Sequence, residues 1–369
     1  MSKAAELAAL IGSQSSLAKP NIVINGAMQA WQRGTTSITA SGPNYFCDRF
    51  ATDHGQGGAT TSQLTLSGSD TPYTLGFRYG LRMTNTTNTT ATNGYRQFRY
   101  RPEAQDIANS GWNYTDPNSS ITLSFWVRSS LAGTYYCTLE PDDQSDKYAY
   151  NIGFTLLANT WTKVTHAVPG HSTLVFNNDN GIGMSIHWRI WLGTDYTTSG
   201  TGTSSWYDTD SSSTLSPDFL QNWANTSSAT FDLTGFQMEL GEVATPFKHE
   251  SYADNLQKCQ RYYCQIENST GSDQYLTTLQ AYNTSGTYGI IKDYPATMRT
   301  KPTVSQSGNF GGYQADSNTW QSGAAFGAFA ATDVGWRTAG FTGTTTLTAG
   351  HAVVCFHSNG SKLMADAEL

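Results

Sequence analysis

The chain has 369 residues, a formal net charge of −7 at pH 7 and 13% charged residues, which is about half the usual charged share. The acidic balance excludes nucleic acid as an expected partner, because phosphate binding depends on a surplus of Lys and Arg. Only a short apolar run precedes Gly12, and no stretch approaches the roughly 18 apolar residues of a membrane span. We therefore expect no signal peptide and no membrane insertion, and folding in a cytoplasm.

The cysteines are scattered, odd in number and free of any CxxC spacing. This distribution favours buried free thiols, with a disulfide as the weaker alternative. The five residues are Cys47, Cys137, Cys259, Cys264 and Cys355.

The first segment, "SKAAELAALIG", predicts a short helix with Ser2 as N-cap and Gly12 as the stop. A helix of this length is marginal alone in water, so it must dock onto another surface. We assign residues 1–19 to this helix and a polar linker that anchors the protein. The predicted anchoring residues are Leu7, Leu10 and Ile11.

Residues 20–248 show one half-buried strand after another, separated by turn-rich stretches. Apolar residues alternate with polar ones in "SITLSFWVRSS" and again in "SIHWRIWLG". This rhythm predicts an all-β sandwich of the jelly-roll type. The faces opposite the aliphatic ones either pack against another surface, such as the helix or a neighbouring chain, or offer an aromatic platform. The residues concerned are Trp126, Arg128, Arg189 and Trp191.

The closing strand of this region, "ATFDLTGFQMELG", changes its parity midway. Phe231 and Leu233 share one face, whereas Phe236 and Met238 share the other. One extra residue flips the face of a strand, and Gly tolerates the backbone that this requires. The sequence therefore predicts a β-bulge near Thr234-Gly235.

Residues 249–264 carry the one long helical pattern of the chain. Ser251 is expected to cap the helix, with Asp254 three residues on. We expect this helix to link two β-domains. Its predicted apolar face carries Tyr252, Leu256, Cys259 and Tyr263, and its polar face Asn255, Lys258 and Arg261.

Residues 265–369 again have strand patterns but few large aliphatic side chains. They predict a smaller C-terminal β-sandwich at the tip of the molecule. Because so short a domain has little apolar area to bury, we expect it to pack against copies of itself and to oligomerise.

Several segments resemble one family of proteins. These are "PNIVINGAMQAWQRGT", "YFCDRFA", "GFQMELGEVATPFKHESYADNLQKCQRYY", "YPATMRTKPTV" and the terminal "DAEL". They resemble tail fibre and related receptor-binding structural proteins of tailed bacteriophages, in particular of cyanophages and other marine phages. The resemblance covers nearly the whole chain, and the third segment is its most specific part.

The resemblance implies a jelly roll similar to carbohydrate-binding modules, followed by a C-terminal β-domain, in homotrimers on the virion. Assembly would take place in the bacterial host cytoplasm. The implied partners are other virion proteins, reached through the N-terminal helix, and host cell-surface polysaccharide.

Carbohydrate-binding jelly rolls often begin with a strand whose carboxylates help to hold a structural calcium. Here that strand reads Asn25-Gly26-Ala27-Met28-Gln29, which lacks them. We therefore predict no cofactor and no metal. Asp232 and Glu239 on the closing strand are weak calcium candidates.

Catalytic patterns are absent from the sequence. The carboxylates of Glu140, Asp142, Asp143 and Asp146 crowd into one turn, which does not suit the paired acids of glycoside hydrolysis. Neither an HExxH nor a GxSxG motif occurs. We predict that the protein is not an enzyme, and a polysaccharide depolymerase is the least favoured alternative.

Sugar binding relies on aromatic faces together with planar hydrogen-bonding side chains. Aromatic residues in loop-like sequence suit this task, and we expect a virion protein of the tail-fibre type that adheres to host glycans. The alternative is a head or tail decoration protein without receptor binding. The candidate glycan-binding residues, beside the platform named above, are Trp112, Tyr114, Trp206, Tyr207 and Trp320.

Overall fold

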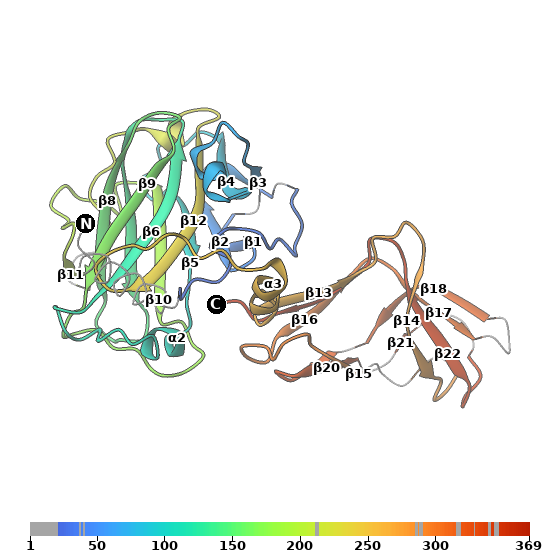
Figure 1. Cartoon of the computed structure of the whole chain (residues 1–369). Helices are drawn as coiled ribbons and strands as arrows, with labels where there is room; N and C mark the ends of the chain where they lie inside the picture. The colour runs from blue at the N-terminus through green and yellow to red at the C-terminus, as the bar shows by residue number, and fades with distance from the viewer. Residues whose placement is uncertain are drawn as a thin grey trace, which may run out of the picture. The chain divides into compact units, whose positions relative to one another are not determined.

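The computed structural model describes residues 21–36, 38–39, 41–210, 214–284, 287, 291–314, 319–327, 329–338, 341–342 and 347–369. The predicted N-terminal helix, with Leu7, Leu10 and Ile11, lies outside the described residues. The chain divides into two compact units, Met1–Asn255 with Leu369, and Leu256–Glu368. The prediction of an all-β fold is confirmed in both (Figure 1).

In the first unit two sheets form the layers of a sandwich (Figure 1). The seven-stranded sheet contains, in spatial order, β1 (Asn44–Cys47), β2 (Phe50–Gly55), β5 (Tyr95–Tyr100), β10 (Met184–Leu192), β7 (Gly133–Pro141), β8 (Tyr148–Leu156) and β11 (Trp206–Asp208). The five-stranded sheet contains β3 (Gly58–Thr65), β4 (Tyr79–Thr87), β12 (Thr230–Leu240), β6 (Ser120–Ser129) and β9 (Thr162–Pro169).

The strand order of the first unit is that of a jelly roll. The inner strands run β5-β10-β7-β8 in one sheet and β4-β12-β6-β9 in the other, with every pair antiparallel. The chain repeatedly passes from one sheet to the other, as two wound hairpins require. The predicted jelly-roll sandwich is therefore confirmed in this unit.

The core lies between the two sheets. The alternating aliphatic residues of β6, from Ile121 to Val127, all join it. Phe231 and Phe236 of β12 both reach it too, because the register of β12 against β6 shifts between Thr234 and Gln237. Gly235 takes a φ of 64° there. The predicted bulge is confirmed, with Gly in the left-handed conformation that it tolerates best.

Strand β10 departs from its predicted alternation at its end. Its register against β5 shifts between Arg189 and Trp191. As a result Trp191 turns into the core and is only 8% exposed, while Leu192 comes to the outer face. A bulge that the sequence did not signal therefore removes Trp191 from the predicted platform.

Helical segments are short. The first unit has η1 (Thr71–Leu75), α2 (Ala104–Ala108) and η2 (Trp223–Asn225), and α3 (Tyr252–Gln260) contains the boundary between the units. Ser251 caps α3 as predicted, since its Oγ accepts a hydrogen bond from the Asp254 amide at 3.2 Å.

Three details of the predicted helix are wrong. Tyr252, expected on the apolar face of the helix, is 56% exposed. Tyr263, expected on its apolar face, begins strand β13. Asn255, expected on its polar face, is 4% exposed and bonded to Asn25. The backbone amide of Asn25 donates to Asn255 Oδ1 at 3.0 Å, so this helical amide serves as an internal tie within the first unit.

The second unit holds three small sheets. Its core includes Met298, Phe310 and Leu363. In spatial order, the first sheet contains β13 (Tyr263–Glu267), β23 (Lys362–Asp366) and β16 (Thr303–Ser307). The second contains β14 (Gln274–Gln280), β22 (Ala352–His357), β17 (Phe310–Gln314), β18 (Thr319–Phe326) and β21 (Phe341–Thr342). The third contains β15 (Ile291–Asp293), β20 (Gly335–Thr338) and β19 (Phe329–Ala331).

All five cysteines are buried free thiols, as predicted. Burial raises the pKa of Cys264 to about 11 and that of Cys355 to about 12, so both stay protonated. Over the part of the chain that the structure describes, none of the helices is long and apolar enough to cross a membrane.

Candidate functional site

The outer face of the seven-stranded sheet carries a row of polar side chains that neighbouring strands place side by side. Gln97 on β5 pairs directly with Asp53 on β2 and with Arg189 on β10. Their exposed fractions are only 6%, 6% and 3%, respectively. Cross-strand partners point to the same face of a sheet, so three chain segments far apart in sequence build one polar surface.

Hydrogen bonds fix the geometry of this row. Gln97 Nε2 donates to Asp53 Oδ2 at 3.2 Å, and the Arg189 guanidinium donates to Gln97 Oε1 and to Glu140. His187 Nε2 lies 3.3 Å from Glu140 Oε2. The row is nevertheless not saturated, because Arg189 Nε and His187 Nδ1 have no hydrogen-bond partner among the described residues.

The charged groups of this row change one another's pKa values. Burial alone would raise the pKa of Glu140, but the charges of Arg189 and His187 hold it at about 2. Burial, followed by the positive charge of Arg189, lowers the pKa of His187 to about 4. At neutral pH Glu140 is therefore ionised and His187 is neutral. Such perturbed groups gather at functional sites more often than on inert surfaces.

The row continues toward one end of the sheet. Arg101 Nε donates to Ser185 Oγ at 2.9 Å, and Ser185 Oγ donates to Asp142 Oδ2 at 2.7 Å. Burial raises the pKa of Asp142. These groups extend the hydrogen-bonding surface beyond Glu140.

Toward its other end the row opens into a hollow of about 190 Å³. The half-buried rings of Tyr95 and Tyr196 lie on it, with centroids 6.4 Å apart and planes at 77°. Burial, and then the Asp53 carboxylate, raises the pKa of Tyr95, so its hydroxyl stays protonated. The residues lining the hollow are Asp53, Tyr95, Gln97, Arg189, Leu192, Tyr196 and Leu215.

The segment after β10 covers part of the same face. Asn151 Nδ2 donates to the Tyr207 hydroxyl at 2.8 Å, and that hydroxyl donates to the Leu215 carbonyl at 3.0 Å. Asn151 in turn accepts a hydrogen bond from Thr138 at 2.8 Å. Tyr207, a predicted glycan-binding residue, thus positions the loop that borders the hollow.

This arrangement suits a ligand rich in hydroxyl groups. A sugar hydroxyl both donates and accepts, and a carboxylate, an amide and a guanidinium held side by side on one sheet face match adjacent hydroxyls. Tyrosine rings supply apolar faces for the C–H surfaces of a sugar. Because the polar groups are held by one another, little side-chain entropy remains to be lost on binding.

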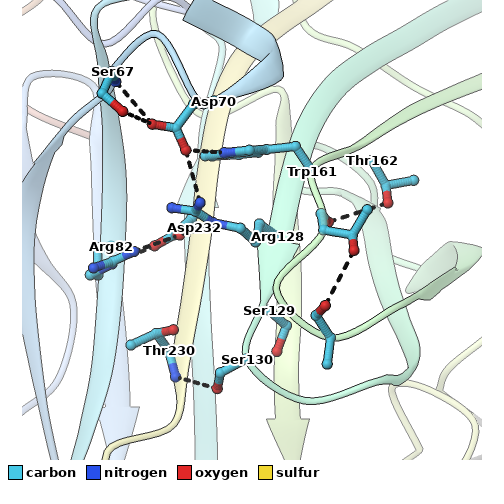
Figure 2. A network of polar contacts seen from close by, with 12 residues as sticks. Ser67, Asp70, Arg82, Arg128, Ser129, Ser130, Trp161, Thr162, Thr230 and Asp232 are labelled. Carbon is cyan, nitrogen blue, oxygen red and sulfur yellow. Dashed lines mark hydrogen bonds and ion pairs between the residues drawn. The ribbon is translucent and has the colours of Figure 1, made fainter.

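The outer face of the five-stranded sheet carries a second network, shown in Figure 2. Asp232 on β12 accepts hydrogen bonds from Arg82 Nε at 2.7 Å and from Arg128 Nε at 2.8 Å. Arg128 also reaches Asp70 at 2.8 Å and lies over the Trp161 ring, 4.6 Å from its centroid. Arg128, predicted to bind glycan, is therefore engaged in holding the sheet together.

Asp70 ties the loop before η1 to this network (Figure 2). Its carboxylate accepts hydrogen bonds from Trp161 Nε1 at 2.8 Å and from the Ser67 amide at 2.9 Å. Burial would raise the pKa of Asp70, but these hydrogen bonds and Arg128 lower it. The carboxylate stays ionised at neutral pH and fixes the loop in place.

A larger hollow, of about 370 Å³, lies on the same face, and Trp126 is part of its floor. The strap of residues 244–249 forms one wall. Glu239 fastens this strap, since it accepts hydrogen bonds from the amide and the hydroxyl of Thr245, both at 2.6 Å. The lining comprises Leu75, Phe77, Ser124, Trp126, Lys163, Gly235, Ala244, Thr245, Pro246, Phe247 and His249.

The weak calcium candidates thus have other roles. Asp232 is committed to two arginines and Glu239 to Thr245. The two carboxylates share no ligand set, and the described residues contain no cluster of three or more His, Cys, Asp or Glu side chains suited to a metal.

Three predicted glycan-binding aromatics are engaged in contacts with the rest of the first unit. Trp112 is 3% exposed, and its Nε1 donates to the Ser119 carbonyl within its own loop at 3.1 Å. Tyr114 packs edge-on against Phe176, with ring centroids 4.9 Å apart. Trp206 Nε1 donates to the Pro169 carbonyl of β9 at 2.8 Å. These contacts fix the three rings within the first unit.

The predicted platform of Trp126, Arg128, Arg189 and Trp191 does not form one surface. Trp126 and Arg128 lie on the five-stranded sheet, Arg189 lies on the seven-stranded sheet, and Trp191 is in the core. Trp320 lies in β18 of the second unit, and its side chain is outside the described part.

Sequence reasoning missed Asp53, Gln97, Tyr95 and Tyr196. A signal existed in "YRQFRY", where Tyr95, Gln97 and Arg99 occupy every second position and therefore share one face of the strand. A second signal was the short distance in sequence between Arg189 and Tyr196, which belongs to the loop after β10. Neither signal indicates which strands are neighbours in the sheet, so neither could show that these residues lie together.

Comparison with known proteins finds no matching family model and no matching curated protein. Among solved structures, the chain is similar to a domain of tailspike protein 4 of bacteriophage CBA120, described as enzymatically active, with 11% identity, a TM-score of 0.29 and 60% of this chain covered. This chain spans only 21% of the length of that one.

Two further similar structures are carbohydrate-binding modules. One is the family 11 module of a Clostridium thermocellum cellulase, with 16% identity, a TM-score of 0.28 and coverage of 56% of this chain and 98% of that one. The other is a tandem of family 22 modules from Paenibacillus barcinonensis, with 10% identity, a TM-score of 0.29 and coverage of 95% and 98%. Likeness at this level carries no inference about ligands.

Proposed function

We propose that the first unit binds a glycan of the host surface through the row and hollow on its seven-stranded sheet, and that the protein is a non-enzymatic virion component of a tailed bacteriophage. One observation carries the binding proposal. A buried set of planar polar groups, Asp53, Gln97 and Arg189, lines a hollow together with two half-buried tyrosine rings.

Structural need alone does not account for this set. Buried charged groups cost free energy unless they are paired, and a sheet face that serves only packing is more stable with apolar residues. Here Arg189 Nε lacks a partner among the described residues, although the residue is 3% exposed. A ligand that completes the hydrogen bonding of this row would recover part of that cost.

The virion part of the proposal rests on the resemblance of residues 235–263 to tail-fibre proteins and on the charge-poor, β-rich composition. The homotrimer, the anchoring role of residues 1–19 and the polysaccharide partner belong to the same proposal. A stable monomer at micromolar concentration in mass photometry would contradict the trimer.

The binding proposal is tested with the full chain and a panel of purified bacterial capsular and O-antigen polysaccharides, in affinity gel electrophoresis or calorimetry. Tyr196→Ala and Gln97→Ala should each weaken binding by about tenfold or more, the effect of losing one stacking or hydrogen-bonding contact. Tyr275→Ala, which removes a tyrosine that is 79% exposed in the second unit, is the matched control.

Two results would overturn the proposal. One is that no polysaccharide of the host envelope binds. The other is that binding occurs but Tyr196→Ala and Gln97→Ala leave it unchanged. Release of reducing ends from a bound polysaccharide would instead assign a depolymerase activity.

A further inference from the structure

The larger hollow, on the five-stranded sheet, is a built cavity. Its volume of about 370 Å³ lies within the range of roughly 300 to 1,000 Å³ common for small-molecule sites. One wall, the strap of residues 244–249, is held by the buried carboxylate of Glu239, and the other wall carries Leu75 and Phe77. The cavity is therefore already shaped before any ligand arrives.

The two walls also contact each other. His249 Nε2 lies 2.9 Å from the Leu75 carbonyl oxygen. The rings of Phe77, Phe247 and His249 form a cluster with centroid separations of 4.8, 5.0 and 4.9 Å. These contacts fix the position of the strap relative to the strands that form the floor of the hollow.

The floor combines a flat aromatic side chain with a single cation. Trp126 on β6 is paired directly with Lys163 on β9, so both side chains rise from the same face of the sheet as close neighbours. Trp126 is half-buried and Lys163 is exposed. Among the described residues Lys163 has no hydrogen-bond or ion-pair partner, and it is the one lysine or arginine in the lining of the hollow.

Apart from Lys163 and His249, the lining is apolar or hydroxylated. Ser124 and Thr245 contribute the hydroxyl groups, and no carboxylate lines the hollow. The carboxylate that holds the strap, that of Glu239 on β12, is 1% exposed and is already hydrogen-bonded to Thr245. An anionic group entering the hollow would therefore meet one unpaired ammonium and no lining carboxylate.

We propose that this hollow is a second saccharide site, specific for an acidic sugar residue whose ring lies on Trp126 and whose carboxylate pairs with Lys163. The C–H face of a sugar ring fits an indole face, and hydroxyl groups at the ring edge fit Ser124 and Thr245. This site lies on the opposite sheet from the one proposed above and does not depend on it.

The test uses the full chain with two probes, an oligomer of galacturonic acid and the same oligomer with its carboxyl groups methyl-esterified. Alginate oligomers, free and esterified, form a second pair. Binding is followed by calorimetry and by saturation-transfer NMR. We expect the acid forms to bind, the esters to bind about tenfold more weakly, and the affinity for the acids to fall with added salt.

Three variants locate the site. Lys163→Gln should reduce the affinity for the acids to that for the esters, and because Lys163 is exposed the variant should fold normally. Trp126→Ala should weaken binding of acids and esters alike. Lys147→Gln, which removes another exposed lysine of the first unit, is the charge-matched control and should change nothing.

The outcomes separate this site from the one on the seven-stranded sheet. Tyr196→Ala should leave binding of the acidic oligomers intact. The inference is overturned if acids and esters bind equally, if Lys163→Gln has no effect, or if none of the acidic oligomers binds. Loss of acid binding in Tyr196→Ala with no effect of Lys163→Gln would place acidic-sugar recognition on the other sheet, and would overturn it as well.

Discussion

The two outer faces of the first unit both bury arginines and carboxylates, but they satisfy them differently. On the five-stranded face, Asp232 receives Arg82 and Arg128 at 2.7 and 2.8 Å, and Arg128 continues to Asp70. On the seven-stranded face, Arg189 and His187 each keep one buried nitrogen without a partner among the described residues. A closed network stabilises a sheet, whereas an open one leaves hydrogen-bonding capacity for a ligand.

The contrast between the two faces is tested most directly by substituting Asp232. Asp232→Asn removes the charge that two arginines share, while Asp232 itself is 1% exposed. Leaving buried cations without their anion typically costs about 3 to 5 kcal/mol, and the partial exposure of both arginines favours the lower part of that range. We expect the free energy of unfolding to fall accordingly in urea titrations, with polysaccharide binding intact while the protein stays folded.

Asp146→Asn is the matched control, because Asp146 is exposed and lies in a turn of the first unit. Its effect should stay below about 0.5 kcal/mol. If Asp232→Asn were equally harmless, the network in Figure 2 would not stabilise the sheet and the proposed division between the two faces would fail.

A second test is the pH dependence of stability. The pKa of His187 is about 4 in the folded protein against its usual 6.5, so between these values the unfolded chain binds more protons. Stability should therefore rise with pH across this window, by roughly 3 kcal/mol at most. His187→Gln should flatten the rise. A slope that survives this substitution would assign it to other groups.

Glu140 acts in a separate window. Its pKa of about 2, against a usual 4.5, gives stability that is present above pH 4.5 and is lost as the pH falls toward 2. Urea titrations between pH 4.5 and 6.5 therefore exclude Glu140 and report on His187 together with His166 and His357, whose pKa values burial also lowers. The difference between the protein and His187→Gln isolates the contribution of His187.

Much of the fold could be predicted from residue periodicity, but the site could not. The alternation in β6 and the parity change at Gly235 depend on neighbours in the sequence, and both were correctly predicted. The pairing of Asp53 with Gln97 depends on which strands lie side by side, and the sequence does not encode strand order in any local pattern.

The individual errors have the same physical origin. Trp191 lies in the core and not on the predicted platform, because β10 contains a bulge that no glycine in the sequence indicates. Asn255 is buried and not on the predicted polar face, because it forms hydrogen bonds with the buried Asn25. In both cases a tertiary contact overrode a local pattern. Aromatic residues in loops were a poor guide for a similar reason, since Trp112 finds its hydrogen-bond acceptor within its own loop.

A third prediction concerns the floor of the larger hollow. Gly235 has a φ of 64°, and an added Cβ would lie 2.8 Å from the Phe77 ring. Gly235→Ala should therefore lower the free energy of unfolding by about 2 kcal/mol, through backbone strain and the ring displacement together. Gly202→Ala, at an open loop position whose nearest neighbour would be 3.4 Å away, is the control and should be close to neutral.

The smallest effect on stability is expected for a hydrogen bond at the surface, because water can replace the protein partner that is lost. Ser251 Oγ accepts the Asp254 amide at 3.2 Å and donates to its carboxylate at 2.7 Å, and both residues are exposed. Ser251→Ala should cost about 1 kcal/mol, the usual value for losing an N-cap. Ser251→Asp, which keeps an acceptor, should recover part of it in thermal unfolding. A loss as large as that of Asp232→Asn would mean that burial does not determine how much these networks stabilise the protein, and that contrast is the physical basis for assigning a structural role to the Asp232 network and a binding role to the row on the seven-stranded sheet.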